Sequence, residues 1–174
     1  MRIIAAPTLT LEPQTVAHAE EMFAVLRDPA IYEYENEPPP SLEWLRTRFA
    51  KLESRQSADG QQQWLNWVIR LPTSEPIGFV QATVHPNGNA GIAYVLASAY
   101  WGRGLARDAV AAMMAELVEH YRVRTFSAVL KRENLRSVKL LERLGFSLAS
   151  IAEHIESQVD LDELLMLRVS ISMS

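Results

Sequence analysis

The sequence contains no cysteine among its 174 residues. This absence excludes disulfides, cysteine-ligated zinc, iron–sulfur clusters and a thiol nucleophile. Glycine and proline are few as well, with 7 and 9 residues, which excludes collagen-like and low-complexity chains. Sulfur-dependent covalent and metal chemistry is therefore ruled out.

Long apolar runs and an excess of positive charge are also missing. No stretch approaches the roughly 18 uncharged apolar residues of a transmembrane helix, and the short segment before Pro7 does not resemble a signal peptide. We therefore expect a cytoplasmic protein without a membrane partner. With 21 acidic and 17 basic residues the net charge is −4, which argues against a nucleic-acid partner bound through a broad basic face.

The composition is that of a folded domain, with 48% hydrophobic and 22% charged residues. At this length a domain buries roughly 70% of its unfolded surface, so no covalent staples are needed. There is no internal repeat and no linker, and we predict one domain over residues 1–174.

The pattern of apolar residues predicts a mixed α/β fold in the order β-α-α-β-β-β-α-β-α-β-β. Helical spacing and capping signals predict helices over 15–27, 42–52, 105–121 and 134–144, with Ser41 as one N-cap and Gly145 closing the last helix. Residues 30–40 read as a proline-rich loop. Strands are expected at 9–11, 64–71, 76–85, 91–96, 125–130, 146–156 and 162–169, and Asn87-Gly88 predicts an antiparallel turn.

The most informative segment runs from Tyr94 to Arg107, where a strand, a loop with two glycines and a long helix follow one another. Glycine allows close backbone approach, and the free N–H groups of a first helical turn suit a phosphate. Arg103 and Arg107 add positive charge. A Walker motif is excluded because no Gly-Lys-Ser/Thr follows, and the dinucleotide fingerprint fails because position 107 is Arg. The alternative is a tight turn with two exposed arginines.

A second segment, residues 129–137 (VLKRENLRS), passes from strand to helix and leads to residues 141–146 (LERLGF). Asn134 is also a simple N-cap candidate. Taken together, the two segments resemble the GNAT acetyltransferase superfamily. Residues 101–106 (WGRGLA) resemble its acetyl-CoA loop, with Trp101 in place of the usual Gln or Arg, and Asn134-Leu-Arg-Ser137 followed by Gly145-Phe146 resembles its second signature.

The resemblance extends to the ribosomal-protein-alanine N-acetyltransferase (RimJ/RimL-like) subgroup. It rests on a Leu-x-Pro near the N-terminus, Asp28-Pro29, the prolines before Ser41-Leu42-Glu43, and Asp162-Glu-Leu-Leu-Met166. This implies a splayed central strand pair and acetyl-CoA as cosubstrate, with no metal. Dimerisation is common in the subgroup, so a homodimer is possible.

The resemblance also implies the roles of individual residues. The pyrophosphate of coenzyme A would lie on the backbone of Gly102, Arg103, Gly104, Leu105, Ala106 and Arg107. The backbone of Val95 and Leu96 would pair with the pantetheine arm, which Asn134 would also contact. Without cysteine, we expect direct transfer to an amine of a peptide or small molecule in a ternary complex.

The catalytic and acceptor residues are less well defined. Ser137 is the candidate general acid, with an ordinary helix-surface serine as the alternative. Leu141 stands where many relatives have Tyr, and Gly91 stands where subgroup members often have a Glu base. The proline-rich loop would border the acceptor through Tyr32, Glu33, Tyr34, Glu35 and Glu37, although solvated loop side chains are the simpler interpretation.

The remaining candidates point to structure rather than chemistry. The four histidines, His18, His85, His120 and His154, lack short-range metal spacing. Trp64 and Trp67 are expected in the core, with the acceptor pocket as the alternative. Two other functions stay open: a non-catalytic acyl-CoA-binding or sensory domain, and a different nucleotide-phosphate binder.

Overall fold

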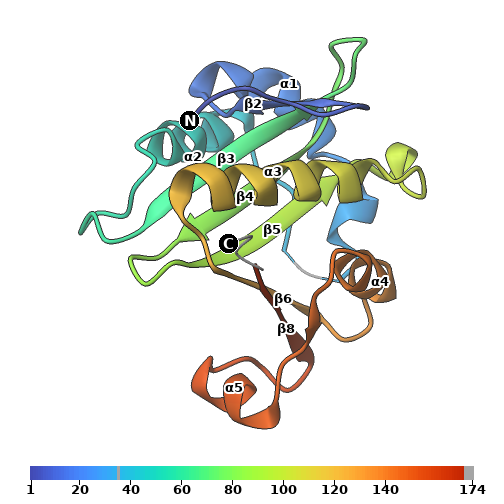
Figure 1. The fold of residues 1–174 in the computed structure, drawn as a ribbon. Coiled ribbons are helices and arrows are strands. Elements are labelled where there is room, and N and C mark those ends of the chain that lie inside the picture. The colour runs from blue at the N-terminus through green and yellow to red at the C-terminus, as the bar shows by residue number, and fades with distance from the viewer. Residues whose placement is uncertain (35, 171–174) are drawn as a thin grey trace.

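The computed structural model describes residues 1–34 and 36–170, and its centre is an eight-stranded sheet (Figure 1). The strand order is β1-β2-β3-β4-β5-β6-β8-β7. The strands are β1 (Ile4–Ala5), β2 (Thr10–Pro13), β3 (Gln63–Arg70), β4 (Pro76–Val84), β5 (Asn89–Leu96), β6 (Thr125–Lys131), β7 (Ser147–Leu148) and β8 (Glu163–Val169). Of the pairs between these strands, β5 with β6 is parallel and the others are antiparallel.

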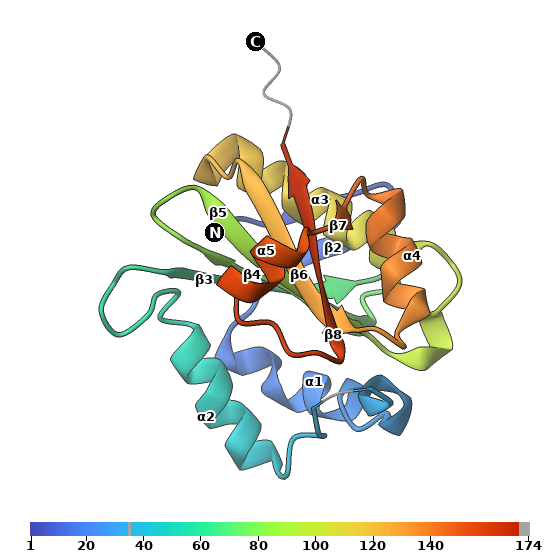
Figure 2. The ribbon, with the colours of Figure 1, turned by 90° about the horizontal axis from the view of Figure 1, so that it is seen from below.

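The α-helices are α1 (Ala19–Val25), α2 (Leu42–Leu52), α3 (Leu105–Tyr121), α4 (Leu135–Arg143) and α5 (Ile151–Glu156). Short 3₁₀ helices cover Val16–His18, Pro29–Tyr32 and Ser98–Tyr100. The two views show α1 and α2 on one face of the sheet and α3 and α4 on the other (Figures 1 and 2). Within the described residues, no helix has both the length and the apolar character needed to cross a membrane.

The sheet separates two apolar cores because successive strand side chains point to opposite faces. Along β3, Leu65, Trp67 and Ile69 join the core under α3, while Val68 joins the core under α1 and α2. This alternation decides which residues of β3, β4 and β5 face the space between the sheet and the first two helices.

Several local predictions are confirmed. Ser41 caps α2, because its Oγ accepts a hydrogen bond from the Trp44 amide at 3.1 Å. Gly145 follows α4 with a φ of 83°, and Asn87-Gly88 forms the turn between β4 and β5. The mixed α/β class and the order of its main elements match the prediction.

One predicted strand is wrong. Residues 146–156 form only the two-residue β7 and then α5. The reason is a capping box: Ser150 Oγ accepts from the Glu153 amide, and Glu153 Oε2 accepts from the Ser150 amide at 2.7 Å. The start of the predicted loop 30–40 also differs, since Pro29–Tyr32 is a 3₁₀ helix, and β1 was not predicted.

Candidate functional site

The centre of the site is the place where β5 and β6 separate. The two strands pair only from Asn89 to Gly91 on β5 and from Thr125 to Ser127 on β6. Beyond Gly91 the described strands diverge, as the resemblance implied. The side of β5 that faces the gap can therefore accept a ligand as an added strand.

Gly78 brings β4 unusually close to β5 beside this gap. A Cβ built on Gly78 would lie 2.0 Å from the carbonyl oxygen of Val95, far inside any permitted contact. The Leu96 carbonyl is occupied by a different group, because it accepts a hydrogen bond from the Trp101 indole Nε1 at 2.8 Å. Val95 is half-buried and Leu96 is buried. The end of β5 is thus held in place by β4 and by the following loop.

The loop after β5 delivers a helix N-terminus next to the gap. Gly102 and Gly104 have φ values of 75° and 77°, a region that other residues rarely adopt. Gly104 is the N-cap of α3, and the Asp108 amide donates to its carbonyl at 3.0 Å. The amides of Leu105, Ala106 and Arg107 precede that first helical bond, so they point away from the helix as anion donors.

Three arginines lie in or beside this loop. Sequence reasoning singled out Arg103 and Arg107 but not Arg136. Arg103 lies over the Tyr100 ring at 5.5 Å, and Arg107 Nη2 pairs with Asp108 Oδ1 at 3.1 Å. Arg136 of α4 lies 3.6 Å from the centre of the Trp101 ring. Position 101 therefore links the loop to α4, a contact between distant segments that has no sequence signal.

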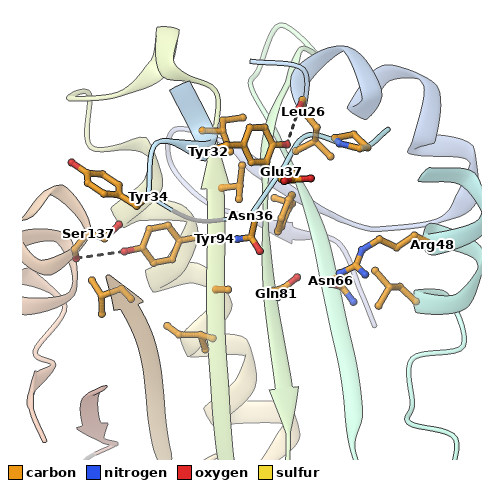
Figure 3. A pocket seen from close by; sticks show the side chains of 18 of the residues that line it. Leu26, Tyr32, Tyr34, Asn36, Glu37, Arg48, Asn66, Gln81, Tyr94 and Ser137 are labelled. Carbon is orange, nitrogen blue, oxygen red and sulfur yellow. Dashed lines mark hydrogen bonds between the residues drawn. The ribbon is translucent and has the colours of Figure 1, made fainter. Parts of the chain in front are cut away.

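The N-terminus of α4 closes the other side of the gap. Asn134 acts as an N-cap, with its Oδ1 accepting from the Ser137 amide at 3.2 Å. The Tyr94 hydroxyl lies 3.5 Å from the Ser137 carbonyl oxygen (Figure 3). Burial raises the pKa of Tyr94 to about 12, against a smaller lowering by Ser137, so its hydroxyl stays protonated at neutral pH. Sequence reasoning missed Tyr94.

A cavity of about 420 Å³ joins these elements. It is lined by residues from both faces of β5: Ile92 and Tyr94 from one face, Ala93 and Val95 from the other. A continuous sheet would not allow this, so the cavity passes through the opening between β5 and β6. Asn134 and Ser137 line it, whereas the residues of the 102–107 loop lie outside it.

Only some of the residues predicted to border the acceptor line the cavity. Tyr32 and Tyr34 line the cavity (Figure 3), and the Tyr32 hydroxyl donates to the Leu26 carbonyl at 2.7 Å. Burial, with a contribution from the charge of Asp28, raises the pKa of Tyr32. Glu33 is exposed and does not line the cavity, and Glu35 lies outside the described residues. Among the described lining residues, Glu37 is the one carboxylate.

Asp28 connects the acceptor side to the end of β5. Its Oδ2 accepts from the Ser98 amide at 2.7 Å, and its Oδ1 accepts from the Ala30 amide at 3.0 Å. Hydrogen bonds from Ser98, then Ala30, lower the pKa of Asp28 from its ordinary 3.8, against the effect of burial. The carboxylate thus holds the 3₁₀ helix of the acceptor loop against the loop that leads to α3.

Three carboxamides form a row in the cavity on the α1/α2 face of the sheet: Gln14, Asn66 and Gln81. Asn66 and Gln81 are cross-strand partners, and the backbone N–H of Gln14 donates to the backbone carbonyl of Asn66 at 2.9 Å. Gln14 is 5% exposed, and its Nε2 has no hydrogen-bond partner among the described residues. An unsatisfied buried donor costs about 1–3 kcal/mol. Sequence reasoning did not single out any of the three.

Trp64, Trp67 and the four histidines do not line this cavity. Trp67 is fully buried and donates to the Arg2 carbonyl at 3.1 Å, whereas Trp64 lines a second, smaller cavity. Over residues 1–34 and 36–170, no three His, Asp or Glu side chains are grouped as a metal site would require.

Comparison with known proteins agrees with this geometry. A family model described as "Acetyltransferase (GNAT) domain" matches residues 8–147. A curated relative from Bacillus licheniformis, named as the uncharacterized N-acetyltransferase p20, is 26% identical over 148 residues, covering 84% of this chain and 83% of the relative.

Two solved structures share the fold. An acetyltransferase of the GNAT family from Bacillus anthracis has a TM-score of 0.75 at 17% identity, covering 96% of this chain and 98% of its own. RimL, described as a ribosomal L7/L12 alpha-N-protein acetyltransferase in complex with coenzyme A, has a TM-score of 0.80 at 20% identity, covering 96% and 97%.

Proposed function

Because the chain belongs to the GNAT acetyltransferase family, we propose that it transfers the acetyl group of acetyl-CoA directly to a primary amine in a ternary complex. Family membership makes the protein an acyltransferase. The two alternatives left open by the sequence, a non-catalytic acyl-CoA-binding domain and a different nucleotide-phosphate binder, are therefore set aside. We further propose a cytoplasmic location, where acetyl-CoA is available.

The observation that carries this proposal is the cavity that passes through the sheet between β5 and β6. Two substrates can meet in it from opposite faces, the thioester along β5 and the amine from the side of α1 and α2. The amides at the start of α3, with Arg103 and Arg107, are proposed to bind the pyrophosphate. RimL, which shares the fold, was solved with coenzyme A, which supports the same ligand here.

The proposed reaction is a single acyl transfer. The neutral amine nitrogen attacks the thioester carbonyl carbon, the C–N bond forms, and the C–S bond breaks to release the thiolate of coenzyme A. The amine loses one proton to solvent or a base, and the thiolate gains one. The chain has no cysteine to hold the acetyl group in between, so no acyl-cysteine intermediate is involved.

Ser137 and Tyr94 are proposed as hydroxyl donors to the developing thiolate. A thiol has a pKa of about 8.5, below the ordinary value of about 10 for a tyrosine hydroxyl. A hydroxyl with a pKa of about 12, as for Tyr94, therefore stabilises the thiolate by hydrogen bonding more readily than by giving up its proton. Glu37 lines the same cavity and is proposed to attract the cationic amine.

The test is a turnover screen with acetyl-CoA against amines and N-terminal peptides, followed by thiol release. Calorimetry with coenzyme A tests binding separately. We expect binding of coenzyme A and turnover of at least one primary amine. Binding without turnover across a broad panel would argue against the proposed reaction, and no binding of coenzyme A would reject the site itself.

A further inference from the structure

The carboxamide row opens into a second cavity of about 250 Å³ whose lining is positively charged. The two cavities share four lining residues: Asn66, Gln81, and Arg48 and Leu52 of α2. The second cavity is also lined by Lys51 and Trp64, and none of its described lining residues is Asp or Glu. In the close-up view, Arg48 extends from α2 toward Asn66 (Figure 3).

The two cations are held over aromatic rings rather than paired with carboxylates. The Arg48 guanidinium lies 5.7 Å from the Trp44 ring centre, and the Lys51 ammonium lies 5.8 Å from that of Trp64. Within the described residues, neither has a carboxylate partner in salt-bridge range. By contrast, Arg46, two residues before Arg48 on the same helix, pairs with Glu20 and Glu43. Arg48 and Lys51 therefore retain charge for a ligand.

The distance across the sheet from β5 to β3 indicates which residue of a peptide acceptor would reach this positive charge. From β5, where the amine must reach the thioester, to β3, which carries Asn66, there are two strand spacings of about 4.8 Å, or roughly 10 Å. An extended peptide advances about 3.3 Å per residue. The third residue of a peptide would thus lie near Asn66, and its side chain could enter the second cavity, which Asn66 lines together with Arg48 and Lys51.

We propose that the acceptor is a peptide N-terminus with an acidic side chain near its third residue. This proposal rests on the proposed function. In it, the side-chain carboxamides of Gln14, Asn66 and Gln81 bind the backbone of the acceptor peptide, because its N–H and C=O groups need both acceptors and donors. The Gln14 Nε2, which lacks a partner among the described residues, donates a hydrogen bond to a carbonyl of the peptide backbone. Arg48 and Lys51 bind the carboxylate of the side chain.

The same geometry disfavours the other amines. A polyamine would place a second positive charge beside Arg48 and Lys51. A free amino acid carries its carboxylate next to the amine, so it does not span roughly 10 Å between β5 and β3. A peptide satisfies both the charge and the distance.

The test compares three amidated tetrapeptides, Ala-Ala-Glu-Ala, Ala-Ala-Gln-Ala and Ala-Ala-Lys-Ala, by kcat/KM from thiol release. We expect kcat/KM to be highest for the Glu peptide, lower for the Gln peptide and lowest for the Lys peptide, with about a fivefold decrease for each change of one charge. These differences should shrink as salt is added. The double variant Arg48→Gln/Lys51→Gln should bring the Glu-to-Gln ratio close to one. Arg46→Gln, on the same helix but outside both cavities, should keep the ratio.

Titration of the same peptides in the presence of coenzyme A instead of acetyl-CoA measures binding without turnover. Peptides that bind in the order Glu, Gln, Lys but are not acetylated would support this subsite and reject the proposed reaction. Peptides acetylated at equal rates whatever the third residue, or spermidine acetylated faster than the Glu peptide, would overturn the subsite and leave the proposed reaction standing.

Discussion

The loop that leads into α3 and the cavity under α1 and α2 present different parts of the chain to a ligand. The loop offers backbone amides, positioned by Gly102 and Gly104 with left-handed φ values. The cavity offers the side chains of Gln14, Asn66 and Gln81, which come from separate segments of the chain. One half of the site is thus built from local backbone geometry and the other from tertiary packing.

This difference determines which substitutions each half tolerates. A backbone site keeps its donors when exposed side chains change, but it loses them when a glycine with positive φ is replaced. A side-chain site loses its donors and acceptors when those side chains are replaced, but it does not depend on a glycine with positive φ. The following variants separate the two halves, starting with the largest expected effect.

Gly104→Glu should disrupt the backbone half most strongly. A non-glycine residue at a φ of 77° is strained, and a carboxylate at the start of α3 repels phosphate, so we expect the Kd for coenzyme A to rise by about 100-fold or more. Calorimetry measures this. Gly60→Glu is the matched control, because Gly60 also has a positive φ, 68°, and nothing within 4 Å of a built Cβ, yet it lies between α2 and β3 rather than at the start of α3. Unchanged affinity in Gly104→Glu would contradict the placement of the phosphate.

Gly78→Ala should damage the junction between the halves. Its Cβ would meet the Val95 carbonyl oxygen at 2.0 Å, which forces β4 and β5 apart beside the cavity. We expect the free energy of unfolding to fall by about 2–3 kcal/mol, measured by urea denaturation, together with loss of acetylation. Gly91→Ala serves as the comparison, because a Cβ there comes no closer than 3.8 Å to the Ser127 Oγ. Equal stability of the two variants would refute the close approach at Gly78.

Asp28→Asn tests the link between the halves and has a defined pH dependence. The folded pKa of Asp28 is lowered, so its stabilising effect is present above its ordinary value of 3.8 and is lost as the pH falls through the folded value. At pH 7 we expect the variant to be less stable by about 1–2 kcal/mol. The difference from the unsubstituted protein should shrink below about pH 4. A difference that stays constant down to pH 2 would show that the charge of Asp28 plays no part.

Gln14→Met should have the smallest effect on folding and affect only the side-chain half. It removes a buried donor without a partner, so the free energy of unfolding should stay equal or rise by about 1 kcal/mol. The KM for the peptide acceptor should rise, while the Kd for coenzyme A stays the same. A loss of stability would mean that Gln14 serves the fold rather than a ligand.

Sequence patterns predicted well those features that depend on neighbouring residues. The α3 start with its two glycines, the Ser41 cap and the closing Gly145 each arise within a few positions of the chain. Neighbouring residues also explain why the strand predicted at 146–156 was wrong. The Ser150–Glu153 capping box is visible in the sequence and favours α5 over a strand.

The acceptor half was not predictable in the same way. Gln14, Asn66 and Gln81 are ordinary polar residues in the sequence, and they become a row only through the registers of β2, β3 and β4. Tyr94 faces the site because β6 separates from β5 after Gly91. Arg136 approaches the α3 loop only because α4 packs beside Trp101.

By itself the sequence determined most of the elements, the absence of a cysteine intermediate, and the helix terminus suited to phosphate, because these depend on composition and on contacts between near neighbours. Only the tertiary structure decided where the two proposed substrates would meet and which residues would surround the amine. The opening between β5 and β6, the carboxamide row and the unpaired cations of α2 bring together residues far apart in the chain. Long-range strand register and helix packing, which no local pattern encodes, place them side by side.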